Sequence, residues 1–127
     1  MDQALERLRR ILVADDDAAI VDAVQMILED SGYAVSTATD GGVVPKVASE
    51  QPDLLLLDIW MSGASGQSIC QELKTNESTR HIPIIMFSAN RDLGAIAQEA
   101  GADDVLGKPF ELTQLLDLVE KHLPRCS

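Results

Sequence analysis

The chain has few cysteines, few basic residues and no long apolar run, and each shortage excludes a class of protein. Only two cysteines occur, Cys70 in a predicted helix and Cys126 close to the last residue. These two positions make neither a disulfide framework nor the paired spacing of a metal-binding motif. We therefore expect a protein of a reducing compartment, the cytoplasm, that folds around a hydrophobic core without disulfides.

Acidic residues outnumber basic residues two to one. The 21 aspartates and glutamates stand against ten lysines and arginines, which gives a formal net charge of −11. This charge favours solubility and opposes the phosphate contacts that dominate nucleic-acid affinity. We expect no direct contact between this domain and nucleic acid.

Long apolar segments and repeats are also missing. No stretch approaches the roughly 18 consecutive apolar residues that a membrane-spanning helix needs, and the charged first ten residues lack the apolar part of a secretory signal. No low-complexity tract or interdomain linker interrupts the chain. With 127 residues and 46% hydrophobic content, the sequence predicts one domain over 1–127, with a core from about 10 to 123 and no membrane association.

The chain does contain short apolar runs that alternate with segments of helical period. This alternation predicts five βα units around a five-stranded parallel sheet, which is the doubly wound α/β class. Residues 54–57 are expected at the centre of the sheet, because a strand covered by helices on both faces is apolar throughout. The predicted strands are 11–14, 33–38, 54–57, 82–87 and 105–107, and the predicted helices are 18–30, 43–50, 67–74, 93–100 and 111–123.

Polar side chains follow several predicted strands at their carboxyl ends. Three acids, 15–17, follow the first strand, Asp58 the third, Ser88 the fourth and Lys108 the fifth. In doubly wound sheets, ligands bind beyond these ends. Poorly solvated carboxylates repel one another, so a divalent cation such as Mg²⁺ together with the Lys108 ammonium would make this arrangement tolerable. The sequence thus predicts a site that handles phosphoryl groups.

Each of these residues also has a purely structural interpretation. Asp17 is better explained as the N-cap of the first helix than as a ligand, and Asp15 or Asp16 taken alone could be a cap too. Ser88 could cap the helix after it, and Lys108 could be a solvated loop lysine. The two histidines, His81 and His122, have no partner at the spacing of a metal or nucleophile pair, so we expect no catalysis from them.

Over nearly its whole length the sequence resembles the response-regulator receiver domain of two-component signalling. The resemblance rests on residues 11–17, on the motif LLLLD-x-x-M-x-G-x-x-G within 53–66, on 82–89 and on 101–110, which ends in Lys-Pro-Phe. It implies a flavodoxin-like sheet with strand order 2-1-3-4-5. It also implies a signalling phosphoacceptor that catalyses its own phosphorylation and dephosphorylation, not an enzyme with a separate substrate.

The resemblance assigns roles to individual residues and partners. Asp58 would accept a phosphoryl group from a sensor histidine kinase or a phosphotransfer protein, and Ser88 and Lys108 would bind phosphoryl oxygens. Mg²⁺ would be held by Asp15, Asp16, Asp58 and the backbone carbonyl of Trp60. A downstream effector protein or domain and a second copy of the chain are further candidate partners.

Some positions depart from the family pattern. Val105 stands where the family usually carries an aromatic ring that moves with the Ser/Thr hydroxyl, so we do not expect the usual ring-coupled switch. The fourth helix is shorter than usual, and Trp60 lies at the mouth of the predicted site, either as cover for the loop or as a shield against water. We therefore expect signalling through another surface. Met26 and Leu118, both apolar and expected off the core stripes of their helices, are candidate contacts.

Other functions fit parts of the same pattern. A degenerate receiver would be a phosphorylation-independent interaction module, which Val105 favours and the intact acids oppose. Phosphatases of the haloacid-dehalogenase type also use an aspartyl nucleophile and Mg²⁺, but they carry a hydroxyl residue where this chain continues Asp17-Ala18-Ala19. A flavodoxin-like cofactor site is disfavoured, because the first loop offers carboxylates where phosphate binding needs hydroxyls and glycines.

Overall fold

Short apolar runs form strands, and amphipathic segments form helices between them. The computed structural model describes residues 9–39, 42–61, 64–88 and 91–123, with only the backbone at 60, 61 and 64. The helices are α1 (Ala18–Asp30), α2 (Val43–Glu50), α3 (Gly66–Thr75), α4 (Leu93–Ala100) and α5 (Leu112–His122). The longer strands are β1 (Arg10–Ala14), β2 (Ala34–Ala38), β3 (Leu54–Asp58), β6 (Ile84–Ser88) and β7 (Asp104–Gly107), and β4 (Trp60–Met61) pairs with β5 (Ala64–Ser65) in a small hairpin.

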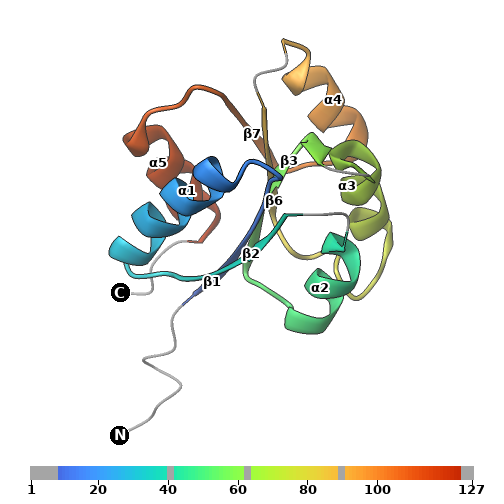
Figure 1. Cartoon of the computed structure of the whole chain (residues 1–127). Helices are drawn as coiled ribbons and strands as arrows, with labels where there is room; N and C mark the ends of the chain where they lie inside the picture. The colour runs from blue at the N-terminus through green and yellow to red at the C-terminus, as the bar shows by residue number, and fades with distance from the viewer. Residues whose placement is uncertain (1–8, 40–41, 62–63, 89–90, 124–127) are drawn as a thin grey trace, which may run out of the picture.

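The five longer strands form one parallel sheet in the order β2-β1-β3-β6-β7. Counted along the chain, this order is 2-1-3-4-5, so the predicted topology is confirmed. Figure 1 shows α1 and α5 on one face of the sheet and α2, α3 and α4 on the other. Such a sheet directs the carboxyl ends of all five strands toward one edge of the molecule.

Strand β3 is the central strand of the sheet and contributes side chains to the hydrophobic layers on both faces. Leu55 and Leu57 belong to the layer beneath α2, α3 and α4, whereas Leu54 and Leu56 belong to the layer beneath α1 and α5. All four leucines are at most 2% exposed, and burying each side chain is worth about 1.5–3 kcal/mol. Packing on both faces therefore fixes the position of Asp58, the last residue of this strand.

Two helix starts follow from the sequence as predicted. Asp17 is the N-cap of α1, because its carboxylate accepts hydrogen bonds from the backbone N–H groups of Ala19 at 3.0 Å and Ile20 at 3.4 Å. Helix α2 begins at Val43. This start puts Pro45 in the first turn, where its missing N–H would have had no intrahelical partner.

Some boundaries differ from the prediction. β2 begins at Ala34 and β6 at Ile84, so Tyr33 and Ile82 are buried side chains of the preceding loops. The β4–β5 hairpin was not predicted, because strands of two residues are too short to show a period. The sequence also predicts a turn at 40–42 and a loop at Gly63; of these residues, 40, 41 and 63 lie outside the described part of the chain.

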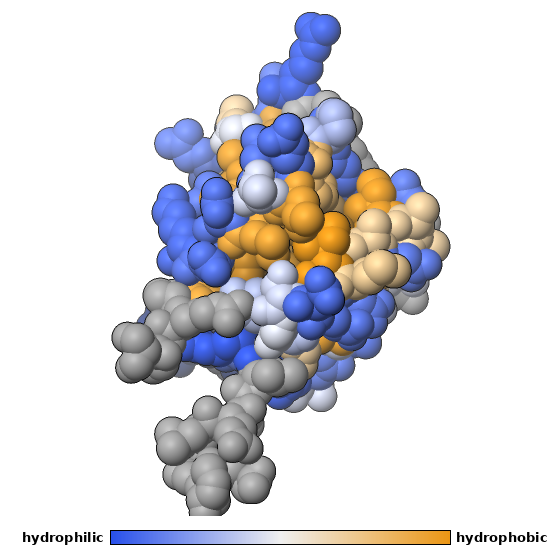
Figure 2. Space-filling model, turned by 90° about the vertical axis from the view of Figure 1, so that its left-hand side faces the viewer, coloured by the Kyte–Doolittle hydropathy of each residue, from blue (hydrophilic) through white to orange (hydrophobic). Residues whose placement is uncertain are grey.

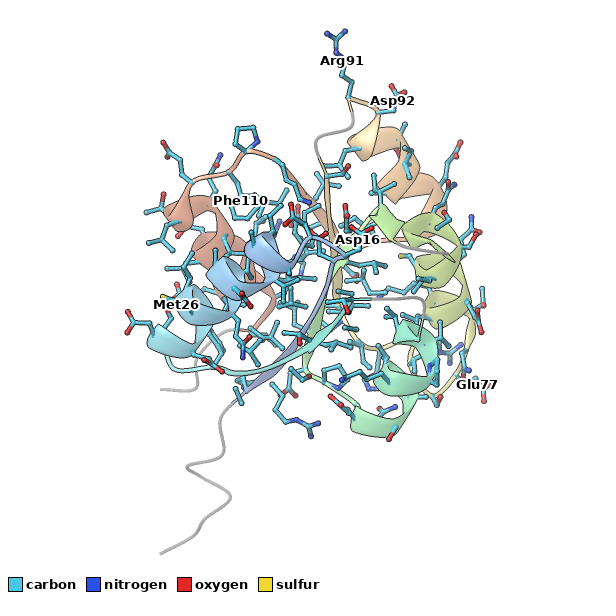
Figure 3. The ribbon with its side chains drawn as sticks, in the orientation of Figure 1. Asp16, Met26, Glu77, Arg91, Asp92 and Phe110 are labelled. Atoms are coloured by element: carbon cyan, nitrogen blue, oxygen red, sulfur yellow. The ribbon has the colours of Figure 1, made fainter. Side chains whose placement is uncertain are left out.

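Large apolar side chains at the surface are few. Met26 is 70% exposed and points away from α1 in Figure 3. Leu118, by contrast, is half-buried against the layer beneath α1 and α5, so its predicted place off the apolar stripe of α5 is wrong. No helix within the described ranges combines the length and the hydrophobicity needed to cross a membrane.

Candidate functional site

The carboxyl ends of the strands bring the predicted polar residues to one edge of the sheet. Asp15 and Asp16 directly follow β1, Asp58 ends β3, Ser88 ends β6 and Lys108 directly follows β7. Carboxylate oxygens of the three acids lie within 4.8 Å of one another. Figure 3 shows Asp16 at this end of the sheet, beyond the strands and between the two layers of helices. The predicted convergence of the three acids is therefore observed.

The three consecutive acids after β1 have different surroundings. Asp15 is fully buried, and its Oδ1 accepts a hydrogen bond from the backbone N–H of Asp17 at 3.0 Å. Asp16 is exposed to solvent, and Asp17 caps α1. Asp58 on the neighbouring strand is 7% exposed. The cluster thus has two buried carboxylates and one that faces water.

Lys108 supplies the positive charge of the cluster. Its Nζ lies 2.8 Å from Oδ2 of Asp15 and 3.8 Å from Oδ1 of Asp58, and its side chain is only 17% exposed. The interpretation of Lys108 as a solvated loop lysine is therefore wrong. One ammonium among three carboxylates, two of them buried, leaves a formal charge of −2, which favours binding of a further cation.

Ser88 is positioned by the pairing of β6 and β7. It is 7% exposed, lies opposite Gly107 in the ladder, and its carbonyl accepts the backbone N–H of Lys108 at 2.9 Å. Helix α4 has Asp92 as its N-cap residue, so the interpretation of Ser88 as the cap of that helix is wrong. The ladder instead holds Ser88 beside the start of the lysine loop.

Gly66 fixes the backbone on the far side of Asp58. Its N–H donates to the carbonyl of Ile59 at 2.5 Å, and a Cβ at this position would collide with backbone atoms of Asp58 and Ile59. Only glycine allows α3 to begin so close to the end of β3. The start of α3 therefore helps to hold the backbone that carries the Asp58 carboxylate.

Two aromatic side chains complete the surroundings of Lys108, and neither was predicted as part of the site. The ring centroid of Phe87 lies 4.8 Å from Nζ of Lys108. Phe110 meets Phe87 edge to face, with centroids 6.3 Å apart and ring planes at 71°. The available signal was an aromatic residue directly before Ser88 in the strand, but its contact with the lysine depends on the rotamer of Lys108.

An apolar groove opens next to this aromatic pair. Its volume is about 470 Å³, and it is lined by Ile20, Ala23, Val24, Ile27, Lys108, Pro109 and Phe110. Figure 2 shows hydrophobic residues gathered on the face of the molecule that α1 and α5 form. The groove shares Lys108 with the acid cluster, so a molecule seated in it would lie beside the carboxylates.

Several residues singled out by the sequence lie apart from this cluster. His81 is exposed in the loop before β6. His122 pairs instead with Asp104, at 3.1 Å, as does Lys121 at 3.0 Å. Partial burial raises the pKa of Asp104, but hydrogen bonds from His122, from Lys121 and from a backbone N–H together bring this pKa below its ordinary value. Asp104 and its two partners lie at the start of β7, whereas the acid cluster lies beyond the end of β7.

Two further predictions concern residues next to the cluster. Trp60 begins β4, two positions after Asp58, and its side chain lies outside the described part of the chain. Val105 on β7 is half-buried and packs against the layer beneath α2, α3 and α4. The carbonyl of Trp60 as a ligand and the altered switch at Val105 stay predictions.

The donor set of the cluster fits a hard divalent cation. Mg²⁺ prefers oxygen ligands, takes one or two carboxylates from the protein and keeps several waters. Two buried carboxylates and one exposed carboxylate, all within 4.8 Å, meet that requirement and leave an open side toward solvent. Among the described residues, this is the one group of three or more potential metal-ligating side chains.

Comparison with known sequences gives the family. Residues 11–120 match the response regulator receiver domain. The chain is 41% identical over 122 residues to the DNA-binding dual master transcriptional regulator RpaA of Synechocystis sp., which covers 91% of this chain and 49% of that protein. It is also 41% identical over 105 residues to the response regulator PleD of Caulobacter vibrioides, which covers 80% of this chain and 23% of that protein. The chain thus spans half or less of these relatives.

Comparison with solved structures agrees. A CheY-like response regulator receiver domain protein from Methanospirillum hungatei is 31% identical with a TM-score of 0.85, over 92% of this chain and 94% of that chain. The receiver domain of a sensor histidine kinase from Pseudomonas aeruginosa, which has a magnesium ion coordinated in its active-site cleft, is 25% identical with a TM-score of 0.86, over 94% of this chain and 100% of that chain. The strand order, the acid cluster and these matches lead to one conclusion: the chain belongs to the response regulator receiver domain family of two-component systems.

Proposed function

We propose that this chain is a Mg²⁺-dependent phosphoacceptor, in which Asp58 takes a phosphoryl group from the phosphohistidine of a sensor histidine kinase or phosphotransfer protein. The observation that carries the proposal is the convergence of three carboxylates within 4.8 Å around the ammonium of Lys108. A degenerate receiver would have no need to keep this costly arrangement of buried charge.

The chemistry asks little of the protein beyond positioning and charge compensation. An oxygen of Asp58 attacks the phosphorus atom, the P–O bond forms as the P–N bond to the donor histidine breaks, and the leaving imidazole takes up a proton. Carboxylates are ordinarily ionised at neutral pH, so the attack needs no general base. Hydrolysis of the resulting acyl phosphate returns Asp58 and releases inorganic phosphate.

Charge compensation comes from the residues around Asp58. Lys108, already 3.8 Å from Asp58, would bind one phosphoryl oxygen, and the hydroxyl of Ser88 would donate a hydrogen bond to another. Asp15, Asp16, Asp58 and the carbonyl of Trp60 would hold Mg²⁺. The bound metal would neutralise phosphoryl charge that these acids otherwise repel. Metal-free protein is therefore expected to be inert.

The groove beside Lys108 is proposed as the docking surface of the phosphodonor. Its lining is apolar, whereas Asp16 and Asp22 on the adjoining segment are exposed. A partner with an apolar patch and a basic rim around its phosphohistidine would fit both features. Met26 lies on the same helix and stays a candidate contact. The signal would then pass to a downstream effector or to a second copy of the chain.

The proposal is tested by labelling the purified chain with acetyl phosphate in the presence and absence of Mg²⁺. We expect labelling that needs the metal, that Asp58→Asn abolishes, and that Asp22→Asn, which changes an exposed acid of α1, leaves intact. Labelling retained in Asp58→Asn would refute Asp58 as the acceptor. A chain that is never labelled yet still binds its partner would be the phosphorylation-independent module, and turnover of small phosphate esters would indicate a phosphatase.

A further inference from the structure

We propose that Phe87 is a positioning residue for Lys108, whose ring holds the ammonium over the acid cluster, with Phe110 fixing the ring in turn. The proposal deepens the proposed function and rests on it, because Lys108 is there the group that meets the phosphoryl oxygens. It adds an aromatic support that acts through the lysine and touches no reacting atom.

The contact between Lys108 and Phe87 has the geometry of a cation–π interaction. Nζ lies 4.8 Å from the ring centroid, within the roughly 6 Å over which the ring quadrupole attracts a cation. Phe87 is 2% exposed and the lysine side chain 17% exposed, so water competes little with the contact. The attraction is strongest where the cation is desolvated, as it is here.

The ring offers Lys108 a partner that does not change during phosphorylation. In the resting cluster the ammonium is also held by Asp15 at 2.8 Å, but a cation bound to Asp15 would compete for the same carboxylate. A lysine has a long, flexible stem and a strongly hydrated head, so it would turn toward solvent once that ion pair weakened. The face of Phe87 binds neither metal nor phosphate, and it would keep the ammonium beside Asp58.

Phe110 holds the supporting ring at a fixed angle. The two rings meet edge to face at 71° with centroids 6.3 Å apart, an arrangement that aromatic pairs favour. Phe110 is half-buried and lines the groove; Figure 3 shows it between α1 and α5. The groove and the ammonium are therefore joined by two consecutive ring contacts.

The test uses beryllofluoride, a phosphoryl mimic, and measures its affinity calorimetrically at saturating Mg²⁺ for the folded whole chain. Phe87→Leu is expected to weaken beryllofluoride binding about threefold to thirtyfold, the span from an exposed to a desolvated cation–π contact, while Mg²⁺ affinity without beryllofluoride stays unchanged. In a Lys108→Met background the same substitution should have no further effect. The matched control is Ile85→Val, which trims the same face of β6 away from the lysine and should change neither affinity.

Three results would overturn the proposal. The first is that Phe87→Leu binds beryllofluoride as tightly as the wild type does. The second is that it weakens Mg²⁺ binding to the same extent as beryllofluoride binding. The third is that its effect persists in the Lys108→Met background, which would show that Phe87 acts only through packing. If Phe87→Leu does not fold, Phe110→Leu takes its place, and an unchanged beryllofluoride affinity then contradicts the proposal. A wild-type chain that binds no beryllofluoride at all would overturn the proposed function itself, a result distinct from the other outcomes.

Discussion

Replacing Lys108 by methionine should destabilise the metal-free protein far more than replacing a surface lysine would. The substitution keeps most of the length of the side chain but leaves Asp15, fully buried, without the ammonium that lies 2.8 Å away. Losing one partner of a buried ion pair costs about 3–5 kcal/mol. Asp15 retains the N–H of Asp17, so we expect a loss near the lower end, about 3 kcal/mol.

Mg²⁺ should reverse part of this loss. A ligand at about 100 times its Kd adds about 2.7 kcal/mol to the folded state that binds it. In Lys108→Met no ammonium competes for Asp15, so Mg²⁺ should bind more tightly than in the wild type and stabilise the variant more. The difference in stability between the two proteins should therefore narrow when the metal is added.

Urea unfolding in EDTA and in excess Mg²⁺ measures both effects, with Lys121→Met as the matched control. Lys121 also pairs with an aspartate, Asp104 at 3.0 Å, but its side chain is 65% exposed. An exposed pair is worth only about 0.2–1 kcal/mol. The reasoning fails if the two variants lose equal stability in EDTA, or if Mg²⁺ leaves the gap between Lys108→Met and the wild type unchanged.

Two further predictions concern stability. Gly66→Ala should lower the free energy of unfolding by about 1–3 kcal/mol, because the added Cβ meets the backbone of Asp58. Gly94→Ala, where a Cβ meets nothing within 4 Å, should stabilise α4 by about 0.5–1 kcal/mol. Thermal unfolding that ranks the two variants the other way would contradict this. Asp104→Asn should destabilise at neutral pH, and the penalty should fade as the pH falls through the lowered pKa of Asp104, because protonation removes the stabilisation that a lowered carboxyl pKa represents. Urea midpoints at neutral pH and at about pH 3 test it, and a penalty that does not shrink in acid would argue against the ion pairs.

The acid cluster could be predicted because it follows from topology. Once residues 11–14 and 54–57 are assigned as neighbouring parallel strands, Asp15 and Asp58 must emerge at the same edge of the sheet. The same logic places Ser88 and Lys108 there. No side-chain detail is needed, since the strand ends alone set the distances to within the reach of a carboxylate or a lysine.

What could not be predicted depends on side-chain packing. Nζ of Lys108 lies over the ring of Phe87, and periodicity carries no information about the lysine rotamer that puts it there. The pairing of His122 with Asp104 depends on the place where α5 ends relative to β7. Leu118 was misassigned because the apolar stripe of α5 is wider than the strict helical period suggests.

The three consecutive aspartates between β1 and α1 have different roles. Asp15 faces the ammonium, Asp16 faces water and Asp17 closes the first turn of α1, while the buried residues before them lock the strand in register with β2 and β3. With both ends anchored, the connection has no slack. Deleting one of these three residues would leave two acids at this point, but each remaining carboxylate would be shifted into the position of its neighbour. The number of residues between β1 and α1 therefore matters more than the acidic character of this connection.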